Sequence, residues 1–112
     1  MASRGEVWVV DLNPTKGHEQ HGRRPALVVS ADPFNHGPAK LVVVVPLTTR
    51  DRGIPLHVRI DPPEGGVRET CFAKCEDVRS VSVERLAKCW GTVGDPRVMR
   101  QVEDRLRILL DL

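Results

Sequence analysis

The chain has 112 residues, of which 40% are hydrophobic and 29% are charged, and this is the composition of one ordinary globular domain. Its net charge of +2 is too small to indicate a nucleic-acid-binding protein by itself. The longest apolar run, Leu41–Leu47, is far shorter than the roughly 20 residues of a membrane span, and no signal-peptide pattern follows Met1, so we expect one cytoplasmic domain, residues 1–112, without membrane contact.

The first two predicted strands flank a loop that is rich in functional groups. Apolar patterning predicts strands over Gly5–Leu12 and Pro25–Ser30, and Pro25, which lacks an N–H, is expected to begin the second. The loop carries Lys16, His18, Glu19, Gln20, His21, Arg23 and Arg24. Segments that only reverse the chain use Gly, Pro, Asn and Asp, so this loop is a candidate binding or catalytic segment. The alternative is a solvated loop without a function.

The next predicted strand leads into a second polar loop. Asp32–Ala39 is expected to be a loop because it contains two prolines and a glycine. Lys40–Val45 is apolar on both faces, which is typical of a central strand or of one covered by a partner. Pro46 is expected to end this strand, so that Thr48 lies at the exit into Arg50–Gly53.

The rest of the chain predicts further short strands and one helix. Strands are expected at Leu56–Ile60, Glu69–Cys75 and Cys89–Val93, with a turn at Pro62–Gly66 and one helical turn within Ser82–Ala87. Asp95 and Pro96 suit the cap and the first position of a terminal helix. Val98, Val102, Leu106 and Leu109 then recur at helical spacing. This order predicts a mainly β fold with a C-terminal helix, a small SH3-like barrel.

The cysteines and histidines do not predict a metal site. Cys71, Cys75 and Cys89 include no Cys-x-x-Cys pair, and with the four histidines they form no cluster of tetrahedral-ligand spacing. We therefore expect small buried thiols, without a disulfide, a metal or a cofactor.

Three segments, in chain order, carry a family resemblance. In the first loop the matching residues are Asp11, Pro14, Gly17, Glu19, Gln20, Gly22, Arg24 and Pro25. The second segment is Val45–Thr49 and the third is Glu76–Ser80. Together they resemble the signature of the MazF/PemK family of toxin endoribonucleases, from about Arg4 to the end of the chain. His18 and Asp77 depart from the residues that are usual in the family.

The resemblance implies the toxin of a type II toxin–antitoxin system. Such a toxin is a metal-independent mRNA interferase that cleaves single-stranded RNA (mRNA, and also rRNA or tRNA) at specific sequences. The 2′-hydroxyl attacks the neighbouring phosphate and leaves a 2′,3′-cyclic phosphate and a 5′-hydroxyl. The reaction needs stabilisation of the phosphorane, a proton acceptor and a proton donor.

Arg24 and Thr48, at matching positions, are the candidates for transition-state stabilisation, because one offers a fork of donors and the other a hydroxyl. The alternatives are a salt bridge between Arg24 and Glu19, and a backbone hydrogen bond of the Thr48 hydroxyl. Glu19 and His57 are better proton acceptors than a guanidinium, which releases its proton reluctantly. We expect Glu19 to assist catalysis.

Base selection is expected to come from groups that hydrogen-bond splayed bases. The candidates for RNA contacts are Gln20, Arg50, Arg52, His57, Lys74, Asp77 and Arg79. The aromatic residues available for stacking are Trp8, Phe34, Phe72 and Trp90, and arginine planes can substitute for them.

Two other classes remain as alternatives: a non-enzymatic gyrase poison of the same fold and a non-catalytic RNA-binding module. Gyrase-binding toxins act through an exposed Trp-Gly at the end of the C-terminal helix, whereas Trp90–Gly91 lies in a predicted strand. The resemblance also implies a homodimer, which the surplus apolar surface of the third strand and the helix favours. It implies a cognate antitoxin as well, whose acidic C-terminal segment occupies the RNA groove.

Overall fold

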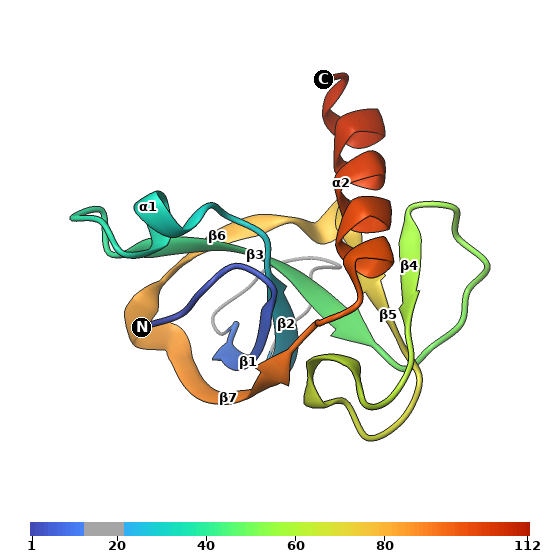
Figure 1. The fold of residues 1–112 in the computed structure, drawn as a ribbon, viewed down its shortest axis with the longest axis horizontal. Helices are drawn as coiled ribbons and strands as arrows, with labels where there is room; N and C mark the ends of the chain where they lie inside the picture. Colours follow the sequence, from blue (N-terminus) through green and yellow to red (C-terminus); the bar gives the residue numbers. More distant parts are fainter. Residues whose placement is uncertain (13–21) are drawn as a thin grey trace.

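Figure 1 shows the fold in the computed structural model, which describes residues 1–12 and 22–112. Within these ranges the chain forms β1 (Glu6–Asp11), β2 (Arg23–Val28), α1 (Asp32–Asn35), β3 (Leu41–Thr48), β4 (His57–Ile60), the 3-10 turn η1 (Glu64–Gly66), β5 (Cys71–Lys74), η2 (Cys75–Asp77), β6 (Arg79–Ser82), η3 (Val83–Arg85), β7 (Leu86–Thr92) and α2 (Pro96–Leu110). The strands pair antiparallel in the order β4-β5-β3-β2-β1-β7, and β6 pairs with β3 beside that path.

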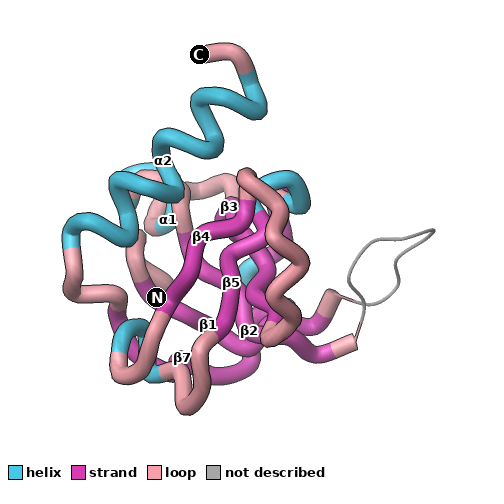
Figure 2. Tube along the Cα trace, turned by 90° about the vertical axis from the view of Figure 1, so that its right-hand side faces the viewer, coloured by secondary structure: helices cyan, strands magenta, loops and turns pink. Residues whose placement is uncertain are grey.

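The sheet is strongly curled, and α2 stands at one end of it (Figures 1 and 2). The predicted mainly β fold with a C-terminal helix is therefore confirmed. The pairing path of the strands that the structure describes does not close on itself, so the sheet is barrel-like but open.

The expectation that Pro46 ends the third strand is wrong, because β3 runs on to Thr48. On one side of β3, pairing with β6 stops at Val44 and pairing with β5 starts at Leu47. Pro46 falls in the gap between these two partners, where its missing N–H costs no ladder hydrogen bond. The proline is thus compatible with a long central strand that changes partner.

Pro25 does not begin its strand either, because β2 starts at Arg23. Pairing of β2 with β3 begins only at Ala26, so on that side Pro25 has no ladder hydrogen bond to lose. Within the predicted loop 32–39 the chain forms the single helical turn α1, whose first turn holds Pro33, a position that tolerates proline.

The remaining boundaries differ modestly from the expectations. β5 is shorter than the predicted strand Glu69–Cys75, and β7 begins before the predicted strand Cys89–Val93. The strand β4 and the helical turn η3 agree with the predictions. No strand was predicted where β6 lies, because its four residues contain only one buried apolar side chain, Val81.

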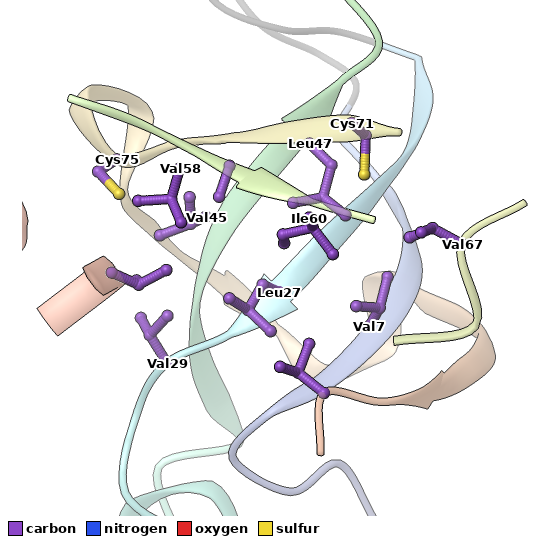
Figure 3. Packing of buried hydrophobic residues seen from close by; sticks show 13 residues of the cluster. Val7, Leu27, Val29, Val45, Leu47, Val58, Ile60, Val67, Cys71 and Cys75 are labelled. Carbon is purple, nitrogen blue, oxygen red and sulfur yellow. The ribbon is translucent and has the colours of Figure 1, made fainter. Parts of the chain in front are cut away.

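Two apolar clusters fill the two sides of the curled sheet. The first includes Val7, Leu27, Val45, Leu47 and Ile60 (Figure 3). Val102 of α2 also belongs to it. The second includes Val10, Leu12, Val28, Val42 and Val44. Successive residues of β2 and β3 alternate between the clusters, because side chains of a strand point to opposite faces. Of the two alternatives for the apolar segment Lys40–Val45, a central strand or one covered by a partner, the structure shows the central strand.

The terminal helix forms as predicted, and its apolar face is covered as far as Leu106. The Asp95 carboxylate caps α2 by accepting a hydrogen bond from the Arg97 N–H, and hydrogen bonds with Arg97 lower the pKa of that carboxyl. Val102 is buried, while Leu110 and Leu112 are exposed. The apolar face of the last turns is therefore left without cover in this chain.

The three cysteines are free thiols, of which Cys71 and Cys75 pack like small apolar residues and Cys89 is partly exposed. Cys71 and Cys75 are buried in the first cluster, as expected, although Cys75 belongs to η2 and not to the strand. Burial raises the pKa of each of these two thiols to about 11, so both stay protonated near neutral pH.

Candidate functional site

A pocket of about 510 Å³ lies where the beginning of β2 meets the end of β3. The loop after β3, the segment after η1, and parts of β5 and β7 complete its wall. The polar residues that line it are Arg24, Thr48, Thr49, Arg50, Arg52, Arg68, Glu69 and Lys74, and the other lining residues include Pro25, Leu47, Val67, Cys71 and Trp90. The fold thus gathers residues from four strands and from the loops after β3 and η1 around one cavity.

The pairing register explains why Arg24 and Thr48 meet at this pocket. Ala26 lies opposite Pro46 in the β2–β3 pair. This is the last pair of the β2–β3 ladder, and two residues beyond it lie Arg24 in β2 and Thr48 in β3, which both line the pocket. The pairing thus brings two residues that are 24 positions apart in the sequence to the wall of one pocket.

Local hydrogen bonds hold the loop that follows Thr48. The Thr48 hydroxyl oxygen accepts a hydrogen bond of 3.2 Å from the Arg50 N–H. The Asp51 carboxylate accepts one of 3.1 Å from the Gly53 N–H. The first bond uses an oxygen lone pair, so the Thr48 hydroxyl can still donate its hydrogen to a ligand. These bonds keep Arg50 and Arg52 beside Thr48.

The pocket has a large excess of positive charge. Among the residues that the structure describes, five cationic side chains line it, Arg24, Arg50, Arg52, Arg68 and Lys74, and one carboxylate, that of Glu69. The four arginines are exposed, and Lys74 forms an ion pair of 2.9 Å with Asp77. Guanidinium groups match the geometry of phosphate oxygens, so this pocket suits a phosphate-bearing ligand.

Of the residues singled out in the sequence, the fold brings Arg24, Thr48, Arg50, Arg52 and Lys74 together at the pocket. Asp77 is not among the lining residues, but it forms an ion pair with Lys74, which is. Arg79 lies in β6 opposite Val44 and does not line the pocket. Glu19 and Gln20 lie outside the described residues, as does His18.

His57 lies apart from the pocket in the interior of the fold. Its side chain is only 3% exposed, and its Nε2 lies 2.8 Å from a carboxylate oxygen of Glu76. This hydrogen bond ties β4 to η2. A side chain so placed does not reach a ligand in the pocket.

No motif in the sequence points to a site role for Arg68 or Glu69, and Trp90 stands out only as one of several aromatic residues. All three line the pocket because η1 packs against β7, a contact between segments without a recognisable motif. The consecutive glycines Gly65 and Gly66 were the one available signal, because paired glycines often mark a close approach of two backbones.

Two absences hold for the residues that the structure describes. No group of three or more His, Cys, Asp or Glu side chains among them is arranged to hold a metal ion. None of the helices formed by residues 1–12 and 22–112 is long and apolar enough to cross a membrane.

Comparison with known proteins gives one consistent family. The family model of the PemK-like, MazF-like toxins of type II toxin–antitoxin systems matches residues 3–110. The chain is 36% identical to the endoribonuclease MazF9 of Mycobacterium tuberculosis, over 100% of this chain and 98% of that protein. It is 39% identical to the Escherichia coli endoribonuclease PemK, over 96% of this chain and 80% of that protein.

Solved structures agree with these sequence matches. A crystal structure of MazF from Deinococcus radiodurans superposes with a TM-score of 0.84 at 30% identity, covering 99% of this chain and 97% of that one. An endoribonuclease from a mycobacterial species, in complex with its cognate antitoxin, gives a TM-score of 0.82 at 27% identity, covering 100% of this chain and 97% of that one.

Proposed function

The chain belongs to the PemK-like, MazF-like family of type II toxin–antitoxin toxins, and from this premise we infer that its cationic pocket is where an endoribonuclease toxin cleaves single-stranded RNA. The observation that carries the inference is the meeting of Arg24 and Thr48, two residues of the family motifs, in a pocket whose described lining holds five cations and one carboxylate. We propose that residues 1–112 act as one domain, in the cytoplasm, where RNA substrates and an antitoxin are made.

In the proposed reaction Arg24 stabilises the phosphorane. Its guanidinium donates hydrogen bonds to the phosphate oxygens as negative charge builds on them, and the Thr48 hydroxyl donates another. Arg50, Arg52 and Lys74 hold the flanking phosphates of the strand. No step draws on a metal or a cofactor, because these donors supply the charge stabilisation.

We assign Glu19 to accept the proton of the 2′-hydroxyl as its oxygen bonds to phosphorus, while solvent water supplies the proton that the leaving 5′-oxygen takes up when its bond to phosphorus breaks. This residue precedes Arg24 by five positions in the sequence, and the buried, Glu76-bound position of His57 leaves the carboxylate as the better acceptor. Gln20 is proposed to contact a base. An indirect effect on RNA binding is proposed for His57, Asp77 and Arg79. Asp77 acts by holding Lys74 in the pocket wall through their ion pair.

The rival non-enzymatic function lacks support. A gyrase poison of this fold depends on an exposed Trp-Gly at the end of the terminal helix. Here Trp90–Gly91 lies inside β7, and α2 ends at Leu110 without an aromatic residue.

The decisive experiment incubates the purified protein with single-stranded RNA in excess EDTA. We expect cleavage at a restricted set of sequences, because the protein's own cations replace a metal. The downstream fragments should accept a 5′-phosphate from a kinase without prior phosphatase treatment, and mass spectrometry should find 2′,3′-cyclic phosphates on the upstream ones. Cleavage that requires Mg²⁺, or binding without cleavage, would contradict the proposed reaction.

We further infer an antitoxin partner and a homodimer. The relatives of known structure include an endoribonuclease bound to its cognate antitoxin and a MazE–MazF complex from D. radiodurans, which superposes with a TM-score of 0.79. An acidic, disordered antitoxin segment would match the cations of the pocket and exclude RNA from it. The exposed side chains of Ile108, Leu110 and Leu112 supply apolar surface that a second copy can cover.

One series of sedimentation runs tests both the homodimer and the binding of the antitoxin. The protein alone, at tens of micromolar, should sediment as a dimer. Adding the acidic C-terminal peptide of the antitoxin should release a bound, uncleavable RNA, and the competition should weaken as salt is raised. A monomer would contradict the dimer, and simultaneous binding of peptide and RNA at every site would contradict competition for the pocket.

A further inference from the structure

Trp90 occupies an irregular position in its strand. In the pairing of β1 with β7, Val7 lies opposite Gly91 and Trp8 lies opposite Cys89. Trp90 is therefore an extra residue without an opposite partner on β1, which defines a β-bulge. Bulges change the direction of a side chain and are frequent next to functional sites.

Close packing of the η1 backbone against β7 holds this bulge in place. A Cβ atom added to Gly66 would lie 2.2 Å from the carbonyl oxygen of Trp90, and one added to Gly91 would lie 3.1 Å from the Gly66 nitrogen. The turn η1 and the bulge thus fit together only because both glycines lack side chains. The same contact brings Arg68, which follows η1, to the pocket wall that Trp90 also lines.

The two tryptophans of the chain differ in their surroundings. Trp8 packs against the second apolar cluster, and its indole N–H donates a hydrogen bond of 3.1 Å to the Glu6 carboxylate. Trp90 lines the cationic pocket and is 41% exposed. One indole thus has a structural place in the fold, whereas the other presents its surface to whatever enters the pocket.

We propose that Trp90 is a stacking platform for a nucleobase of the RNA substrate, beside the phosphate that Arg24 and its neighbouring cations hold. The proposal rests on the proposed function and adds a substrate-binding residue to that site. A volume of about 510 Å³ lies within the range of small-molecule sites, roughly 300–1,000 Å³, and so has room for a nucleotide. Aromatic faces stack on any base, while cations bind the backbone beside it.

Stacking predicts a loss of substrate affinity in Trp90→Ala. Removing an aromatic platform lowers the affinity of a base by about 5- to 150-fold. We expect KM for a short RNA to rise within this range, with a much smaller change in kcat, because the reacting phosphate stays with Arg24 and Thr48. Trp90→Phe retains a stacking face and should recover most of the affinity.

The direct measurement is tryptophan fluorescence during titration with an oligonucleotide that carries a 2′-deoxy nucleotide at the attacked position and cannot be cleaved. Base stacking should quench Trp90 in the wild type and in Trp8→Phe, and the quench should vanish in Trp90→Phe even though that variant still binds. Trp8→Phe is the matched control, because Trp8 does not line the pocket.

The outcomes separate the two proposals. If the wild type cleaves RNA but Trp90→Ala keeps the wild-type KM, or Trp90→Phe keeps the quench, stacking on Trp90 is wrong and the proposed function stands. If the folded wild type neither binds nor cleaves RNA, the proposed function fails and the stacking proposal fails with it. Circular dichroism of each variant shows that the sheet is retained.

Discussion

Arg24→Ala should lower kcat for RNA cleavage by about 100-fold or more while the protein stays folded. Removing one preorganised donor from a site that stabilises developing negative charge typically costs about two to three orders of magnitude in rate. Arg24 is exposed at the beginning of β2 and belongs to neither apolar cluster, so the substitution leaves the buried core intact. Single-turnover kinetics together with thermal unfolding measure both quantities.

Matched variants sharpen this test. Arg23→Ala removes the same charge one residue away, from an exposed side chain that does not line the pocket, and should change the rate only a few-fold. Arg24→Lys keeps the charge but loses the planar fork, so its rate should fall between those of the wild type and Arg24→Ala. The hydroxyl of Thr48 is tested in the same assay, since Thr48→Ser should retain activity that Thr48→Val loses. Near wild-type cleavage by a folded Arg24→Ala would show that the assignment is wrong.

The sequence was sufficient for the features that depend on local pattern. The terminal helix follows from a cap, a first-turn proline and a helical repeat, and α2 begins where these signals predict. The central strand follows from residues that are apolar on both faces, and β2 and β3 do fill both clusters. The meeting of Arg24 and Thr48 was expected from a family resemblance, and the pairing register supplies its physical cause.

Features that depend on tertiary pairing were out of reach. Whether a proline ends a strand depends on what lies beside it, and the gap between β6 and β5 next to Pro46 has no signature in the sequence. His57 looked like a pocket residue, but its burial results from the packing of β4 against η2. Trp90 joined the pocket because of a bulge whose register is set by β1.

Gly66→Ala should destabilise the fold by about 3 kcal/mol or more, combining left-handed backbone strain with overpacking against β7. Gly66 has a φ of +74°, a region that residues with a Cβ rarely adopt. The added Cβ would also lie 2.2 Å from the carbonyl oxygen of Trp90, a backbone atom that cannot turn away as a side chain can. Chemical denaturation should therefore show a much lower free energy of unfolding, or no folded protein.

Substitutions at two other glycines distinguish backbone strain from overpacking as the cause of the lower stability of Gly66→Ala. Gly94 has neither a positive φ nor an atom within 4 Å of an added Cβ, so Gly94→Ala should leave the free energy of unfolding nearly unchanged. Gly53 has a φ of +64° with open space around it, so Gly53→Ala should cost only the backbone strain, about 1–2 kcal/mol. A loss in Gly66→Ala no larger than that in Gly53→Ala would mean that η1 can move away from β7. In that case the turn does not hold the Trp90 bulge, and Gly66→Ala should bind RNA with wild-type affinity. If the contact is rigid, any folded Gly66→Ala protein should instead lose affinity, because Trp90 and Arg68 are displaced together from the pocket wall.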